Sequence, residues 1–257
     1  MKVYYMNGAG NDFMVLDARG LDLDFRALAL KLCPITGADG FMAVDTSEIA
    51  DFRLHFYNSD GSRGEMCGNG ARCICRFACD LGIAPAEMTV ETDAGIVPGW
   101  RIDENQYRVK LNNPSVLDLS RKGHVAYAEL GDPGVPHAVA EYKGDLWGDR
   151  EALRAEMERL RHDGAFPKGA NVNYYQVLGE NQVRVLTFER GVEDFTLACG
   201  TGTGSVACVL WKQGLLTGKL TAHNPGGTLS VTIGGKEEVQ EIFLEGPTQI
   251  VKIFDME

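Results

Sequence analysis

Residues 67–70 read Cys-Gly-Asn-Gly, and the related pattern Cys-Gly-Thr-Gly recurs at residues 199–202. When the chain is aligned with itself at this offset of 132 residues, five glycines fall on glycines between residues 37 and 95. With 31 glycines in 257 residues, chance gives roughly one such match. The chain therefore contains an internal repeat of two similar halves, each with a cysteine at the same place.

Each of these two cysteines stands between an expected strand and an expected helix. Before Cys67, residues 51–57 alternate as a half-buried strand does, and the helical spacing of apolar residues after it stops at Gly82. In the second half the strand is expected at 182–188, and the helix stops at Gly214. Further strands are expected at 87–93, 107–112, 218–224, 228–233 and 241–246, and further helices at 24–33 and 149–162. One apolar helix per half, among many strands, predicts a sheet curled around that helix.

The clustered cysteines could serve packing, a metal site or a phosphate-binding loop. Buried packing is the default for Cys33, Cys75, Cys79 and Cys208, and also for Cys73. A zinc or iron–sulfur site is disfavoured, because the cluster lacks paired CxxC spacing and a helix scatters its sulfurs around the axis. The run at 200–205 ends without the lysine of a phosphate loop. We expect no strand–helix–strand unit around it, and therefore no dinucleotide site.

Cys67 and Cys199 differ from the other cysteines by their position at helix starts. The unpaired N–H groups and the positive dipole end of a helix start favour a thiolate and can hold a carboxylate. Two such thiols, brought together by an internal repeat, supply a base for one side of a carbon atom and an acid for the other. This is the chemistry that inverts a stereocentre, and it requires neither pyridoxal phosphate nor a metal.

Composition excludes other classes of function. A net charge of -11 argues against nucleic acid or an anionic membrane as partner. We expect no targeting segment, and the apolar runs of the sequence are shorter than a membrane span. The seven cysteines are an odd number, so at least one stays unpaired within the chain, which favours a reducing cytoplasm.

An ordered set of motifs over nearly the whole chain resembles the diaminopimelate epimerase family. The motifs are NGAGNDFMVLD at 7–17, GADG at 37–40, YNSDGS at 57–62, CGNGARC at 67–73, GVPHAV at 134–139, ANVN at 170–173, FERG at 188–191, ACGTGTGS at 198–205 and NPGG at 224–227. The resemblance implies an α/β protein of α+β type with two pseudo-symmetric domains, each an antiparallel β-roll around a central helix, and with the active site in the cleft between them. The expected boundaries are 1–115, joined by 246–257, for the first domain and 116–245 for the second.

The resemblance also implies the activity. The expected enzyme is a cofactor-independent isomerase that interconverts LL- and meso-2,6-diaminopimelate, a small-molecule amino acid used for lysine and peptidoglycan precursors, and it is expected to be a homodimer. Cys67 and Cys199 take the acid and base roles, and His137 and Glu189 tune the thiols or position the substrate. The expected substrate-binding residues are Asn11, Asn58, Gly68, Asn69, Asn171, Arg190, Gly200 and Thr201. No metal ligand is expected.

Several alternatives remain open at this point. Asn58 suits a turn, Asn171 suits a backbone contact before a strand, and Arg190 with Glu189 suits a surface pair. Val135 stands where many members of the family have asparagine. The alternative functions are a racemase of another amino acid, such as proline, histidine or glutamate, on the same fold, and a non-catalytic thiol protein that senses redox state or binds metal. Asn69 favours diaminopimelate, because chains like proline racemase usually carry histidine there, and the paired cysteine motifs argue against a sensor.

Overall fold

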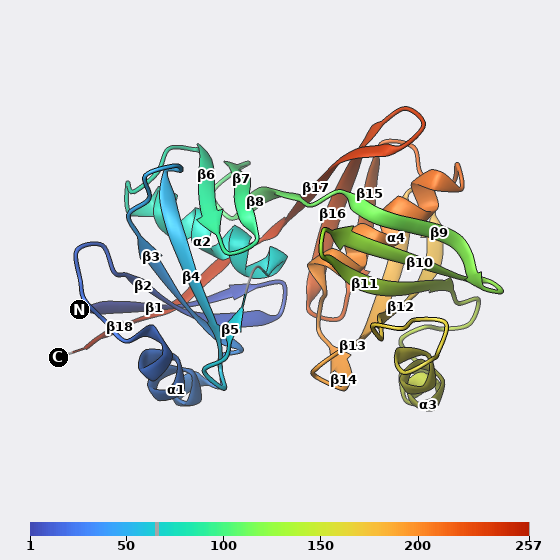
Figure 1. Ribbon diagram of the computed structural model, residues 1–257, viewed down its shortest axis with the longest axis horizontal. Coiled ribbons are helices and arrows are strands. Elements are labelled where there is room, and N and C mark those ends of the chain that lie inside the picture. Colours follow the sequence, from blue (N-terminus) through green and yellow to red (C-terminus); the bar gives the residue numbers. More distant parts are fainter. Residues whose placement is uncertain (65–66, 257) are drawn as a thin grey trace. The chain divides into compact units, whose positions relative to one another are not determined.

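The structure is a computed structural model that describes residues 1–64 and 67–256 (Figure 1). The chain divides into two compact units, with Met1–Lys110 and Glu245–Glu257 in unit 1 and Leu111–Leu244 in unit 2. Within the described part of the chain, no helix is both long and apolar enough to span a bilayer. The architecture is mixed α and β, as the sequence predicted, with many strands and one central helix in each unit.

Unit 1 is one curled sheet. Its strands pair in the order β18–β1–β2–β3–β4–β6–β7–β8, with the short β5 beside β4. The pairs β2–β3 and β4–β6 are parallel, and the other pairs in this order are antiparallel. The bounds are β1 Lys2–Gly8, β2 Asn11–Asp17, β3 Gly40–Asp45, β4 Phe52–Asn58, β5 Arg63–Gly64, β6 Glu87–Thr92, β7 Gly95–Arg101, β8 Gln106–Leu111 and β18 Gln249–Asp255.

Unit 2 repeats this topology. Its strands pair in the order β9–β10–β11–β12–β13–β15–β16, with the short β14 beside β13, and the parallel pairs are β11–β12 and β13–β15. These pairs occupy the same places in the sheet as the parallel pairs of unit 1, so the repeat seen in the glycines is a repeat of topology. The bounds are β9 Pro114–Lys122, β10 Val125–Gly131, β11 Gly134–Glu141, β12 Asn171–Gly179, β13 Gln182–Glu189, β14 Asp194–Thr196, β15 Lys219–Asn224, β16 Gly227–Gly235 and β17 Val239–Pro247.

A central helix lies inside the curl of each sheet: α2 (Gly68–Asp80) in unit 1 and α4 (Gly200–Lys212) in unit 2. Both helices are buried around most of their circumference, because strands from both ends of the sheet pack on them. Each helix is followed by a left-handed glycine, Gly82 with φ of 66° and Gly214 with φ of 72°. Only glycine adopts this conformation without strain, and the sequence had predicted both stops correctly.

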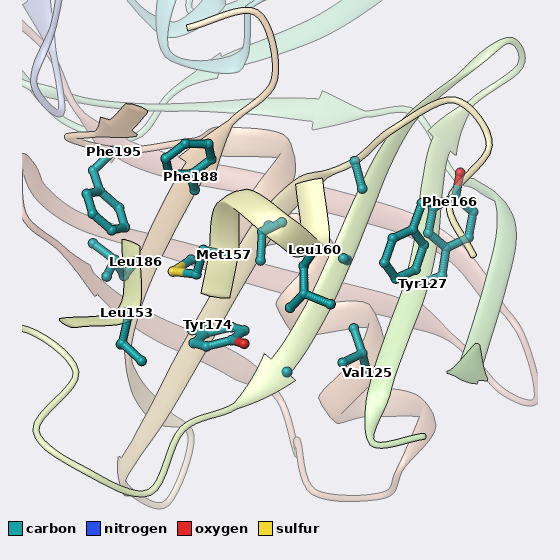
Figure 2. Close-up of a cluster of buried hydrophobic side chains, with 14 of the residues drawn as sticks. Val125, Tyr127, Leu153, Met157, Leu160, Phe166, Tyr174, Leu186, Phe188 and Phe195 are labelled. Carbon is teal, nitrogen blue, oxygen red and sulfur yellow. The ribbon is translucent and has the colours of Figure 1, made fainter. Parts of the chain in front are cut away.

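The outer face of each sheet carries one more helix, α1 (Phe25–Thr36) or α3 (Arg150–Arg161). Figure 2 shows how α3 is held in unit 2: Leu153, Met157 and Leu160 point from the helix toward aromatic and aliphatic side chains of β12 and β13. Met157 is completely buried. This packing holds α3 against the strands that carry the polar residues described below.

One expectation from the sequence is wrong. Residues 200–205 do lie in a strand–helix–strand unit. Strand β13 precedes α4 in the chain and β15 follows it, and these two strands pair in parallel. Parallel neighbours need a crossover, and the central helix provides it. In unit 1, β4 and β6 flank α2 in the same way.

Candidate active site

Cys67 is the N-cap residue of α2. Its backbone is extended, with φ of -126° and ψ of 121°, and its carbonyl accepts the first helical hydrogen bond from Ala71 N at 2.7 Å. Gly68 and Asn69, which follow it, are buried, and the first turn of the helix contains no acidic residue. The positive end of the helix dipole is therefore not compensated by a side chain of this turn, which suits it to an anion.

A polar network holds this first turn in place. Asn69 donates from Nδ2 to Asn11 Oδ1 at 2.6 Å, and Asn11 donates in turn to Asp39 Oδ2 at 3.1 Å. Asp39 also accepts from the backbone N–H of Asp12 at 2.9 Å. The structure thus brings two of the predicted substrate-binding residues, Asn11 and Asn69, into direct contact at the start of α2.

Arg72 completes the network from inside the unit. Its guanidinium is fully buried and donates to Gly68 O at 3.1 Å and to Asn69 Oδ1 at 2.9 Å. No carboxylate of the described residues forms an ion pair with it, and its Nε has no hydrogen-bond partner among them. Burial lowers the pKa of Arg72 to about 10, against the opposing effect of the nearby Cys73 and Cys67 thiols. A buried cation therefore lies beneath the first turn of α2.

Asn58 behaves as its turn sequence indicates. It is exposed at the end of β4, and its Nδ2 donates to Ser62 Oγ at 2.9 Å across the following turn. The next residue, Ser59, donates its backbone N–H to Asp39 O at 3.0 Å. The turn of Asn58 is therefore tied to the segment that holds Asn11.

Cys199 occupies the matching N-cap position of α4, with φ of -118° and ψ of 114°. Its side chain is turned into the helix start, where Sγ accepts from Gly202 N at 3.3 Å and lies 3.5 Å from Thr201 Oγ1. The residue is 8% exposed, and this helix also has no acidic residue in its first turn. A thiolate at this place is stabilised by the N–H group that already points at the sulfur.

Unit 2 also gathers predicted residues around α4. Asn171, at the start of β12, accepts from the backbone N–H of Arg190 at 2.8 Å and donates to Pro136 O at 3.3 Å. Arg190 is exposed and donates from Nη1 to Lys168 O at 3.0 Å. These two hydrogen bonds confirm the backbone contact that the sequence left open for Asn171. Glu189, the last residue of β13, is half-buried beside Arg190.

His137 lies on β11 directly beside Asn171 of the parallel β12. It is fully buried, and burial, with a smaller effect of the positive charge of Arg190, lowers its pKa to about 3. A neutral imidazole follows from this burial at physiological pH.

The remaining cysteines do not lie at the start of a helix, as Cys67 and Cys199 do. Burial raises the pKa of Cys33 to about 11 and that of Cys73, Cys75 and Cys208 to about 12. Within the described residues, no group of three or more His, Cys, Asp or Glu side chains is arranged to hold a metal ion. Thiols of this kind are inert packing residues, as predicted for these four. Cys79 is half-buried rather than buried.

Sequence reasoning missed four polar residues that hold the predicted ones. Asp39, Arg72, Asn173 and Thr187 each make hydrogen bonds to these residues or to one another. A signal was available for three of them: Asp39 aligns with Asn171 in the repeat, and Arg72 and Asn173 lie within the quoted motifs. Thr187 had none, because its role depends on which strand lies next to β13.

Comparison with known proteins identifies the family. The diaminopimelate epimerase family profile matches residues 3–117 and 134–251. The chain belongs to the diaminopimelate epimerase family. Relatives named diaminopimelate epimerase include one from Chlorobaculum tepidum, 37% identical with 96% of this chain and 97% of the relative covered, and one from Aquifex aeolicus, 34% identical with 99% and 96% covered. The family and the class of enzyme, an isomerase, that the motifs indicated are thus confirmed.

Solved structures agree on the fold. A PhzF-family phenazine biosynthesis protein from Bacillus anthracis matches with a TM-score of 0.74 at 15% identity, covering 100% of this chain and 99% of that one. A hydroxyproline epimerase from Agrobacterium vitis matches with a TM-score of 0.68 at 14% identity, covering 99% of this chain and 90% of that one. At these identities the likeness is one of fold, and the diaminopimelate epimerase family shares its architecture with them.

Proposed function

We propose that this chain interconverts LL- and meso-2,6-diaminopimelate, with Cys67 and Cys199 acting on opposite sides of the reacting α-carbon. The observation that carries the proposal is the same in both units: a cysteine at the N-cap of a buried central helix, in a chain of this family. A single helix-start thiol has many uses, whereas a duplicated one suits a reaction that needs two proton-transfer groups.

The chemistry balances without any further reactant. One thiolate takes the α-proton, so a C–H bond breaks and an S–H bond forms, and the electron pair moves onto the α-carbon and its carboxylate. The other thiol then gives its proton to the opposite face of the carbon, which forms the new C–H bond and leaves a thiolate. The enzyme exchanges these roles when the reaction runs in the other direction.

The two helix starts stabilise the charge that develops. Backbone N–H groups at Gly68–Asn69 and Gly200–Thr201 bind the reacting carboxylate, because neither first turn has an acidic residue to compete for them. Stabilisation of negative charge on the carboxylate lowers the barrier to loss of the α-proton.

The polar residues of the two units bind the distant end of the substrate. Arg190 keeps most of its guanidinium N–H groups available to a carboxylate, since among the described residues its side chain donates one hydrogen bond, to Lys168 O. Asn11, Asn58 and Asn171 offer amide groups to the distant ammonium and carboxylate. His137 and Glu189 position the reacting amino acid or tune the thiols.

Cofactor, assembly and location belong to the same proposal. The two-thiol reaction requires no cofactor, so activity is expected to survive treatment with hydroxylamine and a metal chelator. The seven cysteines are an odd number, so at least one stays unpaired within the chain, which favours a reducing cytoplasm. The homodimer rests on the family resemblance and is tested by sedimentation of the purified protein.

The deciding experiment measures conversion of LL-diaminopimelate in heavy water with reductant present. Wild-type enzyme incorporates solvent deuterium at the α-carbon and forms the meso isomer, and Cys67→Ala and Cys199→Ala each abolish the conversion. Cys79→Ala is the matched control, because this half-buried thiol lies on the same helix as Cys67, three turns away from its start. Full conversion by either of the first two variants would contradict the two-thiol mechanism.

A substrate panel tests the identity of the amino acid. Diaminopimelate, lysine, proline, histidine and glutamate are compared as substrates for α-proton exchange. The proposal expects turnover of diaminopimelate far above the others. Preferential turnover of proline or histidine would instead assign a racemase on this fold.

A further inference from the structure

Asn173 and His137 form a buried pair in unit 2. Asn173 Nδ2 lies 3.1 Å from His137 Nδ1, and both residues have no exposed surface. The other ring nitrogen, His137 Nε2, is also buried and has no hydrogen-bond partner among the described residues. A buried ring nitrogen without a partner is costly, so its state and purpose require an explanation.

The contacts of Asn173 settle which way its amide group points. Its oxygen accepts a hydrogen bond from Thr187 Oγ1 at 2.9 Å. Its nitrogen faces two backbone carbonyls, Ala138 O at 3.3 Å and Asn171 O at 3.1 Å. If the amide were turned over, its oxygen would face both carbonyl oxygens with no proton between them. The Nδ2 donor therefore faces the imidazole.

This orientation determines the tautomer of His137. An amide N–H group donates to Nδ1, so Nδ1 has to be the acceptor and carries no proton. The ring proton of the neutral imidazole is then on Nε2. The ring remains neutral because burial lowers the pKa of His137 to about 3, an effect increased by the positive charge of Arg190.

The pair lies against the start of α4. A Cβ atom built on Gly202 would come within 2.2 Å of Asn173 Oδ1, so the amide is packed directly on this glycine. The N–H of Gly202 is the group that donates to Cys199 Sγ at 3.3 Å. The amide of Asn173 thus contacts both the imidazole of His137 and the helix turn that holds the Cys199 thiol.

We propose that Asn173 is a positioning residue, which holds His137 as the Nε2–H tautomer and so makes this imidazole a hydrogen-bond donor to the substrate's reacting carboxylate. The inference rests on the proposed function, since it takes the bound anion to be the amino-acid carboxylate at the start of α4. It also decides between the two roles that the family resemblance left open for His137: this side chain positions the substrate and does not tune a thiol.

The tautomer is tested on the intact wild-type enzyme without substrate. Protein labelled with nitrogen-15 histidine is examined by two-dimensional NMR, in which the two ring nitrogens of each tautomer give distinct signals. The signals of His137 are assigned by their loss in His137→Gln. The expected result at neutral pH is an unprotonated Nδ1 and a protonated Nε2 in an imidazole that does not titrate down to about pH 5. Protonation at Nδ1, or an imidazolium ion, would overturn the proposal.

Two variants separate positioning from a merely structural role. In Asn173→Asp a carboxylate replaces the donor, which draws the ring proton to Nδ1 and stabilises the imidazolium ion. We expect the NMR signals to show this change and kcat to fall about tenfold or more, as the loss of one hydrogen bond to a charged group predicts. Thr187→Val is the matched control, since it removes a hydrogen bond of the same buried network but leaves the two carbonyls that orient the amide. Its tautomer should be that of the wild type, and an equal loss of the Nε2–H form in both variants would refute the role given to Asn173.

Failure of this inference can be told from failure of the proposed function. The tautomer is read from the free enzyme, whatever substrate it uses. Donation to the carboxylate is read from the Nε2–H proton signal, which should move downfield when excess diaminopimelate is added. If the tautomer is as expected and this signal does not move although diaminopimelate is turned over, the donor role is wrong and the proposed function stands.

Discussion

Arg72 donates a hydrogen bond to the side-chain oxygen of Asn69 at 2.9 Å, and neither residue has appreciable exposed surface. The pair connects the interior of unit 1 to the first turn of α2, which begins at Cys67. Unit 2 has no pair that corresponds to Arg72 and Asn69, because Gly204 occupies the position of Arg72 in the repeat. The first turn of α2 therefore has a buried arginine in contact with it, whereas α4 has a glycine at the matching position.

The first prediction follows from this difference. A buried cation favours the anionic form of a neighbouring thiol. Arg72→Leu should therefore slow the reaction of Cys67 with iodoacetamide by about tenfold, measured by peptide mapping in a Cys199→Ala background. Arg76→Leu is the control, because Arg76 is on the same helix but bonds to Asp80, Asn105 and Thr248 O. Equal slowing by both substitutions would contradict an effect of the charge behind Cys67.

The second prediction compares two glycines at matching places in the repeat. A Cβ on Gly202 would meet the amide of Asn173, which several hydrogen bonds hold in place, whereas a Cβ on Gly70 would meet the end of the flexible Met42 side chain. Gly202→Ala should lower kcat by more than about tenfold, and Gly70→Ala should cost much less, since a methionine terminus can move aside. Steady-state kinetics of the two variants test this. The reverse order of sensitivity would show that the amide is not held as described.

The third prediction concerns stability against acid. The pKa of His137 is lowered from 6.5 to about 3 in the folded chain. Between these values the unfolded chain binds a proton that the folded chain does not, so stability falls as the pH falls. From about pH 7 to about pH 5, this residue should contribute a loss of about 2 kcal/mol in the free energy of unfolding. Urea unfolding at the two pH values measures it.

The control for this effect is a second histidine. His137→Gln should remove the contribution, so that its stability depends less on pH, while His162→Gln at an exposed position should behave as the wild type does. If His137→Gln loses as much stability as the wild type between the two pH values, the buried imidazole is not the cause.

The fourth prediction tests the two thiols together. If they act on opposite sides of one carbon, mild oxidation should join Cys67 to Cys199 and abolish activity, and reductant should restore it. Peptide mapping after oxidation identifies the bond. Cys67→Ser should form no such bond under the same treatment. Finding both thiols still open to alkylation in the inactivated enzyme would contradict the prediction.

Much of the fold could be predicted because its signals are local. The alternation before Cys67, the helical spacing after it and the stop at Gly82 each depend on neighbours in the sequence, and each is found in the structure. Comparing the chain with itself added the repeat. The parallel pairing of β13 with β15 was not anticipated, since strand direction depends on where the crossover helix packs and not on the strand's own residues.

The sequence by itself determined the duplicated helix starts, their two cysteines and the family, because glycine spacing, apolar periodicity and motif order are properties of the chain alone. The tertiary structure decided what each polar side chain does. Asn69 meets Asn11 from 58 residues away, and Asn173 meets His137 from 36 residues away across a parallel strand pair. An amide or an imidazole takes its role from the atoms that face it, and strand register and burial choose those atoms only when the chain has folded.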